Sequence, residues 1–177
     1  MCHFVTLIVP TDEVAAVREI MRRHERDAKP IDNPSVRAVL HDGEHQYLTT
    51  PGHCDCGTVL APRHETPETF EDTLAKKRAR MKRRGWSDAK IARALDDLRK
   101  NDARPNAGGS DSLELWHAAL RDLRDQLKLP YAGLLVRFYS GAIATEAFRT
   151  SRRDIPRGEP WQDALASLEH DQVTIFR

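Results

Sequence analysis

The sequence predicts an α+β fold with a mixed or antiparallel sheet and a helical insertion in the middle of the chain. Short runs of β-branched and apolar residues lie near both ends of the sequence, where they can supply the strands of a sheet. Between them, residues 64–129 carry apolar side chains at helical spacing. The length of 177 residues fits a single domain over 1–177 with that segment inserted in it. A ferredoxin-like order of the outer elements is one arrangement of this class.

The first third of the chain is predicted to form a strand, a helix and a hairpin. Residues 3–9 are mostly apolar or β-branched and are followed by a proline, which indicates a buried strand that ends there. Thr11 can cap the next helix, in which valine, isoleucine and methionine recur at helical spacing up to Met21. Residues 36–40 and 46–49 flank an Asp-Gly pair, which is typical of a tight hairpin turn.

The insertion and the last quarter of the chain show further helical and strand patterns. Three helices are expected in the insertion: one that starts near Pro67, one capped by Ser87, and one that carries leucines up to Leu127. A flexible break at residues 106–110 separates the last two. The elements expected after the insertion are strands over 132–139 and 142–148, a helix that begins at Pro160, and a strand over 172–176.

Charge and hydropathy narrow the classes of function. The chain has 28 Lys and Arg against 27 Asp and Glu, and a formal net charge of +1 argues against a protein-wide attraction to nucleic acid or anionic membrane. The opening residues do not have the form of a secretory signal, and no run approaches the ~18 apolar residues needed to span a bilayer. We therefore expect a cytoplasmic protein with no membrane contact, whose cysteines stay as free thiols or bind metal.

The most informative segment is a short loop rich in metal-binding residue types. Two cysteines, a histidine and an aspartate lie there between two glycines that free the backbone to curl. Thiolate and imidazole are ligands that zinc prefers, and structural zinc sites usually hold four ligands in a tetrahedron. The first strand should begin near this loop, so its first residues are the natural source of a remaining ligand. The sequence therefore predicts a transition-metal site, with zinc the favoured metal, built from Cys54, Cys56, His53, Cys2 and His3.

Two other interpretations of this loop stay open. Only Asp55 separates Cys54 from Cys56, whereas paired cysteines in structural zinc sites usually enclose two to four residues, so the metal is not fixed. One thiol could instead be reactive and activated by His53, with Asp55 opposing thiolate formation unless it orients a histidine. Cysteine is also a small hydrophobic residue that often packs in a core. The role expected for a metal or thiol site here is structural or regulatory.

Cys2 also allows a catalytic interpretation. Removal of Met1 would expose its amine, which can act as the base for its own thiol. In this one residue the start of the chain resembles the class II glutamine amidotransferases, and the resemblance implies an N-terminal nucleophile at Cys2. The glycine that usually follows that nucleophile is replaced here by His3, and the chain is short for the four-layered domain of the family.

A basic segment points to a different class of function. Residues 76–84 carry seven positive charges in nine positions, and acidic residues on both sides favour a solvated helix face. One alternative is a non-enzymatic interaction module, such as an adaptor or a toxin-neutralising protein, whose protein partner binds the charged insertion. Another is nucleic-acid binding along the same helix. The sequence has no phosphate-binding loop, dinucleotide fingerprint, nucleophile elbow or zinc-protease motif, so no catalytic or cofactor-binding residue is assigned.

Overall fold

The computed structural model describes residues 2–61, 70–103, 111–156 and 158–177, which divide into two units. We call Met1–Pro62 together with Ser110–Arg177 the sheet unit, and Arg63–Gly109 the helical unit. The helix start expected near Pro67 and the break expected at residues 106–110 lie outside the described residues. No helix in the described part of the chain is long and apolar enough to cross a membrane.

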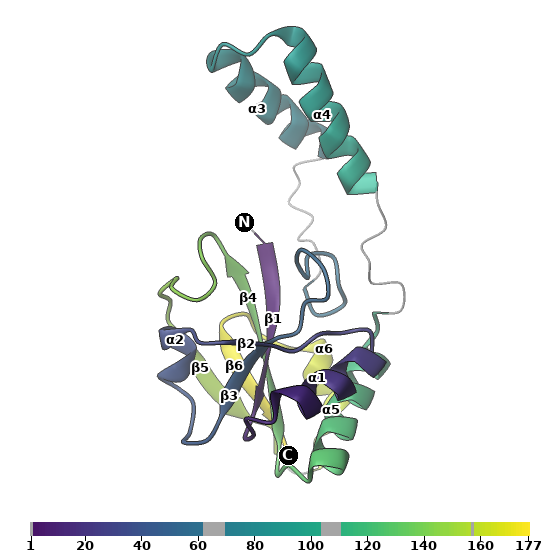
Figure 1. The fold of residues 1–177 in the computed structure, drawn as a ribbon, viewed down its shortest axis with the longest axis vertical. Helices are drawn as coiled ribbons and strands as arrows, with labels where there is room; N and C mark the ends of the chain where they lie inside the picture. The colour runs from purple at the N-terminus through teal and green to yellow at the C-terminus, as the bar shows by residue number, and fades with distance from the viewer. Residues whose placement is uncertain (1, 62–69, 104–110, 157) are drawn as a thin grey trace. The chain divides into compact units, whose positions relative to one another are not determined.

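A six-stranded sheet forms the centre of the sheet unit (Figure 1). Its strands are β1 (Cys2–Val9), β2 (Lys29–Ile31), β3 (His45–Leu48), β4 (Ala132–Tyr139), β5 (Ser151–Asp154) and β6 (Gln172–Phe176). The strand order is β2-β3-β1-β4-β6-β5, and all neighbours are antiparallel except β5 and β6, which are parallel. This confirms the predicted α+β class with a mixed sheet. The strand order by itself does not establish a ferredoxin-like arrangement.

Helices cover both faces of this sheet. The helices of the sheet unit are α1 (Val14–Arg23), α2 (Pro34–Arg37), α5 (Leu113–Leu127) and α6 (Trp161–Ala166). The helices α1, α5 and α6 lie on one side of the sheet and α2 on the other (Figure 1). Val5 and Leu7 of β1 belong to the core that includes residues of α1, α5 and α6, whereas Ile8 packs with Val36 of α2 in a second core. Because both faces are buried, β1 has the mostly apolar sequence of a central strand.

The helical unit has a small hydrophobic core of its own. In the described residues it consists of two helices, α3 (Phe70–Arg83) and α4 (Asp88–Ala103). Of the three helices expected within 64–129, α3 and α4 belong to this unit, whereas α5 belongs to the sheet unit. The buried residues that join the two helices are Leu74, Ile91 and Leu95.

The strand predicted over 36–40 is wrong. Its first residues belong to α2, because the side chain of Asn33 caps that helix by accepting a hydrogen bond from Ser35 N–H (2.8 Å). The proline that follows Asn33 also suits a first helical position. The predicted hairpin turn is wrong as well: the chain turns at Asp42-Gly43, but only Gly43 has a positive φ (+82°), and the strand that pairs with β3 on this side is β2.

The strand predicted over 142–148 is also wrong. The chain turns there around Glu146, whose carboxylate accepts a backbone hydrogen bond from Ser140 (2.8 Å) and pairs with Arg137 (3.0 Å). The next strand is β5, which runs parallel to β6. By contrast, β4 and β6 span the residues predicted for them.

A buried ion pair joins the residue before β3 to β5. The Glu44 side chain is fully buried and accepts hydrogen bonds from Arg152 Nη1 (2.7 Å) and Nη2 (2.9 Å). It also accepts one from His41 N–H (2.7 Å). Burial alone raises the pKa of Glu44, but the donors from Arg152 and His41 outweigh it and hold the pKa below its ordinary value of 4.5.

We expect Glu44→Gln to destabilise the protein at neutral pH by about 1–3 kcal/mol, because a charge-assisted pair is lost and Arg152 stays mostly buried. The lowered pKa means that the folded state binds fewer protons than the unfolded chain, so the stabilisation is complete above pH 4.5 and is lost as the pH falls through the folded-state pKa. Urea unfolding at neutral and acidic pH measures both effects. Glu19→Gln, at an exposed position of α1, is the control. A difference between wild type and Glu44→Gln that does not shrink in acid would contradict this account.

Candidate metal centre

The first half of β1 extends past the end of β3, which pairs only with the second half. Backbone groups in the interior of a protein need hydrogen-bond partners, and the loop formed by residues 49–61 supplies them. Thr49 N–H donates to the carbonyl of Val5 (3.0 Å), and Asp55 N–H donates to the carbonyl of His3 (2.9 Å). The loop therefore lies along β1 in the place where a neighbouring strand would continue.

Two side chains of the loop act as acceptors for the remaining amides on this edge. Asp55 Oδ2 accepts a hydrogen bond from Val5 N–H at 2.8 Å, and Cys56 Sγ accepts one from His3 N–H at 3.1 Å. These bonds hold the loop and its cysteines against the start of β1. Metal-bound thiolates commonly accept hydrogen bonds from backbone N–H groups in the same way.

Three thiols meet at this point. The Sγ atoms of Cys2, from β1, and of Cys54 and Cys56, from the loop, all lie within 4.8 Å of one another, and the three residues are half-buried. A tetrahedral zinc ion with Zn–S bonds of about 2.3 Å separates its sulfur ligands by about 3.8 Å. Small side-chain rotations would therefore let one ion contact all three. No other group of this kind occurs among the described residues.

The two histidines predicted for the site lie in different surroundings. The His3 side chain is buried, its Nδ1 is 3.7 Å from Cys56 Sγ, and its ring lies beside those of Phe138 (4.8 Å) and His170 (5.1 Å). Nitrogen and sulfur ligands of one tetrahedral zinc ion are about 3.6 Å apart, so the distance of His3 from Cys56 suits a shared ion. His3 is nevertheless not part of the group whose ligand atoms all lie within 4.8 Å of one another. His53 is exposed and does not belong to the thiol group.

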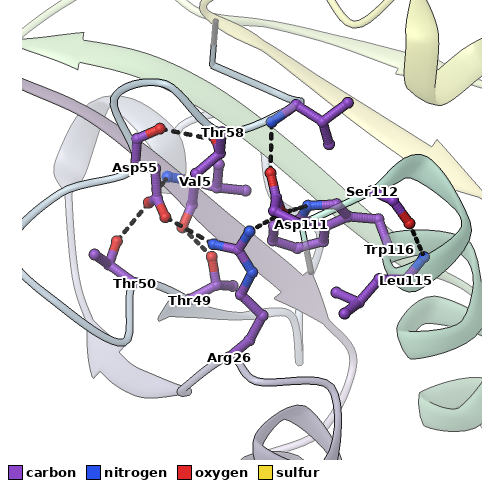
Figure 2. Close-up of polar contacts among 11 residues, drawn as sticks. Val5, Arg26, Thr49, Thr50, Asp55, Thr58, Asp111, Ser112, Leu115 and Trp116 are labelled. Carbon is purple, nitrogen blue, oxygen red and sulfur yellow. Dashed lines mark hydrogen bonds and ion pairs between the residues drawn. The ribbon is translucent and has the colours of Figure 1, made fainter. Parts of the chain in front are cut away.

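Asp55 holds the loop from inside the protein (Figure 2). Its side chain is fully buried, and besides Val5 N–H it binds the hydroxyl of Thr50 (2.5 Å) and Nη1 of Arg26 (3.0 Å). Burial raises the pKa of Asp55, and these donors act in the opposite direction. The carboxylate binds the amide, the hydroxyl and the guanidinium, so the interpretation in which it orients a histidine is not supported.

Arg26 connects this loop to α5. Its guanidinium is buried, stacks 4.5 Å from the ring of Trp116, and pairs with a second carboxylate, that of Asp111 (Figure 2). Asp111 in turn accepts hydrogen bonds from Trp116 Nε1 (3.0 Å) and from the backbone of Val59 in the loop. One buried cation therefore serves two buried carboxylates, one between the two loop cysteines and one that binds the loop backbone at Val59.

Arg26 and Asp111 are absent from the residues that the sequence indicated. Arg26 follows a run of charged residues at the end of a predicted helix, and Asp111 follows a segment rich in glycine and asparagine. Neither position carries a local pattern of a buried residue. Only the proximity of the loop to α5 in the folded sheet unit makes them partners.

The protonation of the thiols bears on whether one of them is a nucleophile. Burial raises the pKa of Cys56 to about 11, and the nearby thiols of Cys54 and Cys2 add to the effect, against the opposing N–H of His3. Burial and Cys54 also raise the pKa of Cys2. The thiolate is the reactive form of cysteine, so the raised pKa values argue against Cys2 and Cys56 as activated nucleophiles in the metal-free protein.

Comparison of the chain with protein-family models, with curated proteins and with solved structures finds no match.

We expect Arg26→Met to destabilise the protein by about 3–5 kcal/mol, because it leaves the buried carboxylates of Asp55 and Asp111 without their cation. Equilibrium unfolding in urea measures the change. Arg121→Met, at an exposed position of α5, is the matched control and should change the free energy of unfolding by less than about 0.5 kcal/mol. Equal effects of the two substitutions would show that the buried network does not stabilise the fold.

Proposed function

We propose that the protein binds one transition-metal ion, zinc in preference to other metals, through Cys2, Cys54 and Cys56, with His3 as the fourth ligand. The observation that carries this proposal is the meeting of three sulfur atoms within 4.8 Å, although they come from segments about 50 residues apart. Three thiolates and one imidazole form one of the usual ligand sets of structural zinc, and soft sulfur ligands select against magnesium and calcium.

The role that follows from this ligand set is structural. Four protein ligands leave no open position for a substrate or a water molecule, in contrast to catalytic zinc sites. The ion would join the first residues of β1 to the loop that lies beside them, so its binding free energy would add to the stability of the folded sheet unit. A regulatory role is compatible with the same ligands, because thiolate sites release metal when their sulfur atoms are oxidised.

The cellular compartment is part of the proposal. A reducing, cytoplasmic environment keeps thiols free to bind metal, whereas three neighbouring cysteines in an oxidising environment tend to form a disulfide. The reactive-thiol interpretation receives less support, because burial raises the pKa of both Cys2 and Cys56.

Purified under reducing conditions, the native protein should contain about one zinc ion per chain, measured by elemental mass spectrometry. Serine in place of Cys2, Cys54 or Cys56 should remove the bound metal, because a hydroxyl is a poor zinc ligand. His53→Ala, which alters the same loop at an exposed position, should retain it. The absence of stoichiometric metal from the wild-type protein would refute the proposal, whatever the stability of the variants.

The fourth ligand is tested by replacing zinc with cobalt, whose absorption spectrum reports its ligands. The wild-type protein should show strong sulfur-to-cobalt charge transfer together with the visible bands of a tetrahedral site. His3→Gln should keep the charge-transfer bands but change the visible bands and weaken the affinity for metal. An unchanged spectrum and affinity would remove His3 from the ligand set while leaving the three thiolates.

A further inference from the structure

The helical unit presents a concentrated cationic surface. We define the basic hairpin surface as the six exposed cations on the second half of α3 and at its end, which are Lys77, Arg78, Arg80, Lys82, Arg83 and Arg84. Lys77, Arg80 and Arg84 recur at i, i+3 and i+7, so they form a stripe along one side of the helix. Arg84 N–H still donates to the carbonyl of Arg80 (3.2 Å), which continues the helical geometry to the end of the stripe.

The way the hairpin is packed keeps these cations in solvent. The buried residues of α3 and α4 contact each other, and the half-buried Met81 and Trp86 pack against the same small core. Gly85, at a φ of +74°, allows the chain to turn sharply between the helices. Lys90 on α4 lies with its Nζ 4.2 Å from the ring of Trp86 and adds another exposed cation beside the turn.

The charges of the basic hairpin surface are not neutralised within the described part of the chain, where none of the six cations forms an ion pair with a carboxylate. Residues 76–84 contain seven of the 28 Lys and Arg and no acidic residue, so the rest of the chain has 21 basic residues against 27 acidic ones. A polyanion would therefore be attracted to this segment and repelled by the remainder.

We propose that the basic hairpin surface binds the phosphate backbone of nucleic acid without reading base sequence. Phosphate contacts need exposed lysine and arginine side chains at close spacing, which α3 supplies, and carry no sequence information. The six cations have only Ala79 and the half-buried Met81 between them, so the surface has no base-reading amide side chain and no aromatic platform.

Two other polyanionic partners fit this surface less well. An anionic membrane binds amphipathic helices whose large apolar residues are free to insert, whereas the large apolar residues described in α3 and α4 are buried or packed against the hairpin core. A protein partner is usually held by exposed aromatic and aliphatic anchors, and protein interfaces are depleted in lysine. This inference does not rest on the metal site.

Binding of the full-length protein to a short fluorescent DNA duplex of random sequence, followed by anisotropy at several salt concentrations, tests the proposal. The test variant is Lys77→Gln/Arg80→Gln/Arg84→Gln, which removes three charges without losing much helix propensity. We expect its affinity at low salt to fall by at least about tenfold, and the slope of log affinity against log salt to decrease by about 2–3. The control, Arg22→Gln/Arg121→Gln/Arg149→Gln, removes three exposed charges from the sheet unit and should keep the wild-type affinity and slope.

Several results would overturn the proposal. One is that the wild-type protein does not bind the duplex at low salt. A second is that the control variant loses as much affinity for the duplex as the test variant does. A third is that the wild-type protein binds phosphatidylserine vesicles or polyglutamate as tightly as it binds DNA. Binding should also persist after treatment with a chelator, because the basic hairpin surface is separate in sequence from the cysteines. A failure of the DNA experiment would therefore leave the metal proposal intact, and the reverse also holds.

Discussion

The first half of β1 extends past the end of β3, and the need of its backbone groups for hydrogen-bond partners determines much of the structure of the sheet unit. The amides and carbonyls of this half need partners, and the loop of residues 49–61 provides them with Thr49, Asp55 and Cys56. Once Asp55 serves this purpose it is fully buried, and a buried carboxylate needs a cation. Arg26 fills that need, and the proximity of the three thiols follows from the same loop placement.

The sequence predicted elements whose structure depends on local patterns and missed those that depend on tertiary contacts. β4 and β6 are mostly apolar runs, and their bounds agree with the prediction. The errors at 36–40 and 142–148 arise where Asn33 and Glu146 bind backbone amides and impose a helix start and a turn. A hydrophobic pattern gives no information about such polar contacts.

In the candidate site, too, the sequence predicted what depends on local patterns and missed what depends on tertiary contacts. Two closely spaced cysteines and a third at the start of the first strand were enough to predict that thiols would meet there. The adjacency of His53 to Cys54 in sequence did not determine its environment, because neighbouring loop residues can point in different directions. Arg26 could not be predicted, because its partners, Asp55 and Asp111, come from segments distant in sequence.

The two units also use arginine differently: it neutralises buried carboxylates in the sheet unit and stays exposed along α3 in the helical unit.

The position of the helical unit in the chain has a consequence for folding kinetics. β1 pairs with β4 in a register that places Cys2 opposite Tyr139, so the central pairing of the sheet must close a loop that contains the entire helical unit. Non-local pairings of this kind slow folding, because the entropy of loop closure is lost before the contacts form. The contacts within α3 and α4 are local and can form first, which shortens the loop. The contacts between β1 and residues 49–61 close a much smaller loop, so we expect this corner of the sheet to form before β4 docks.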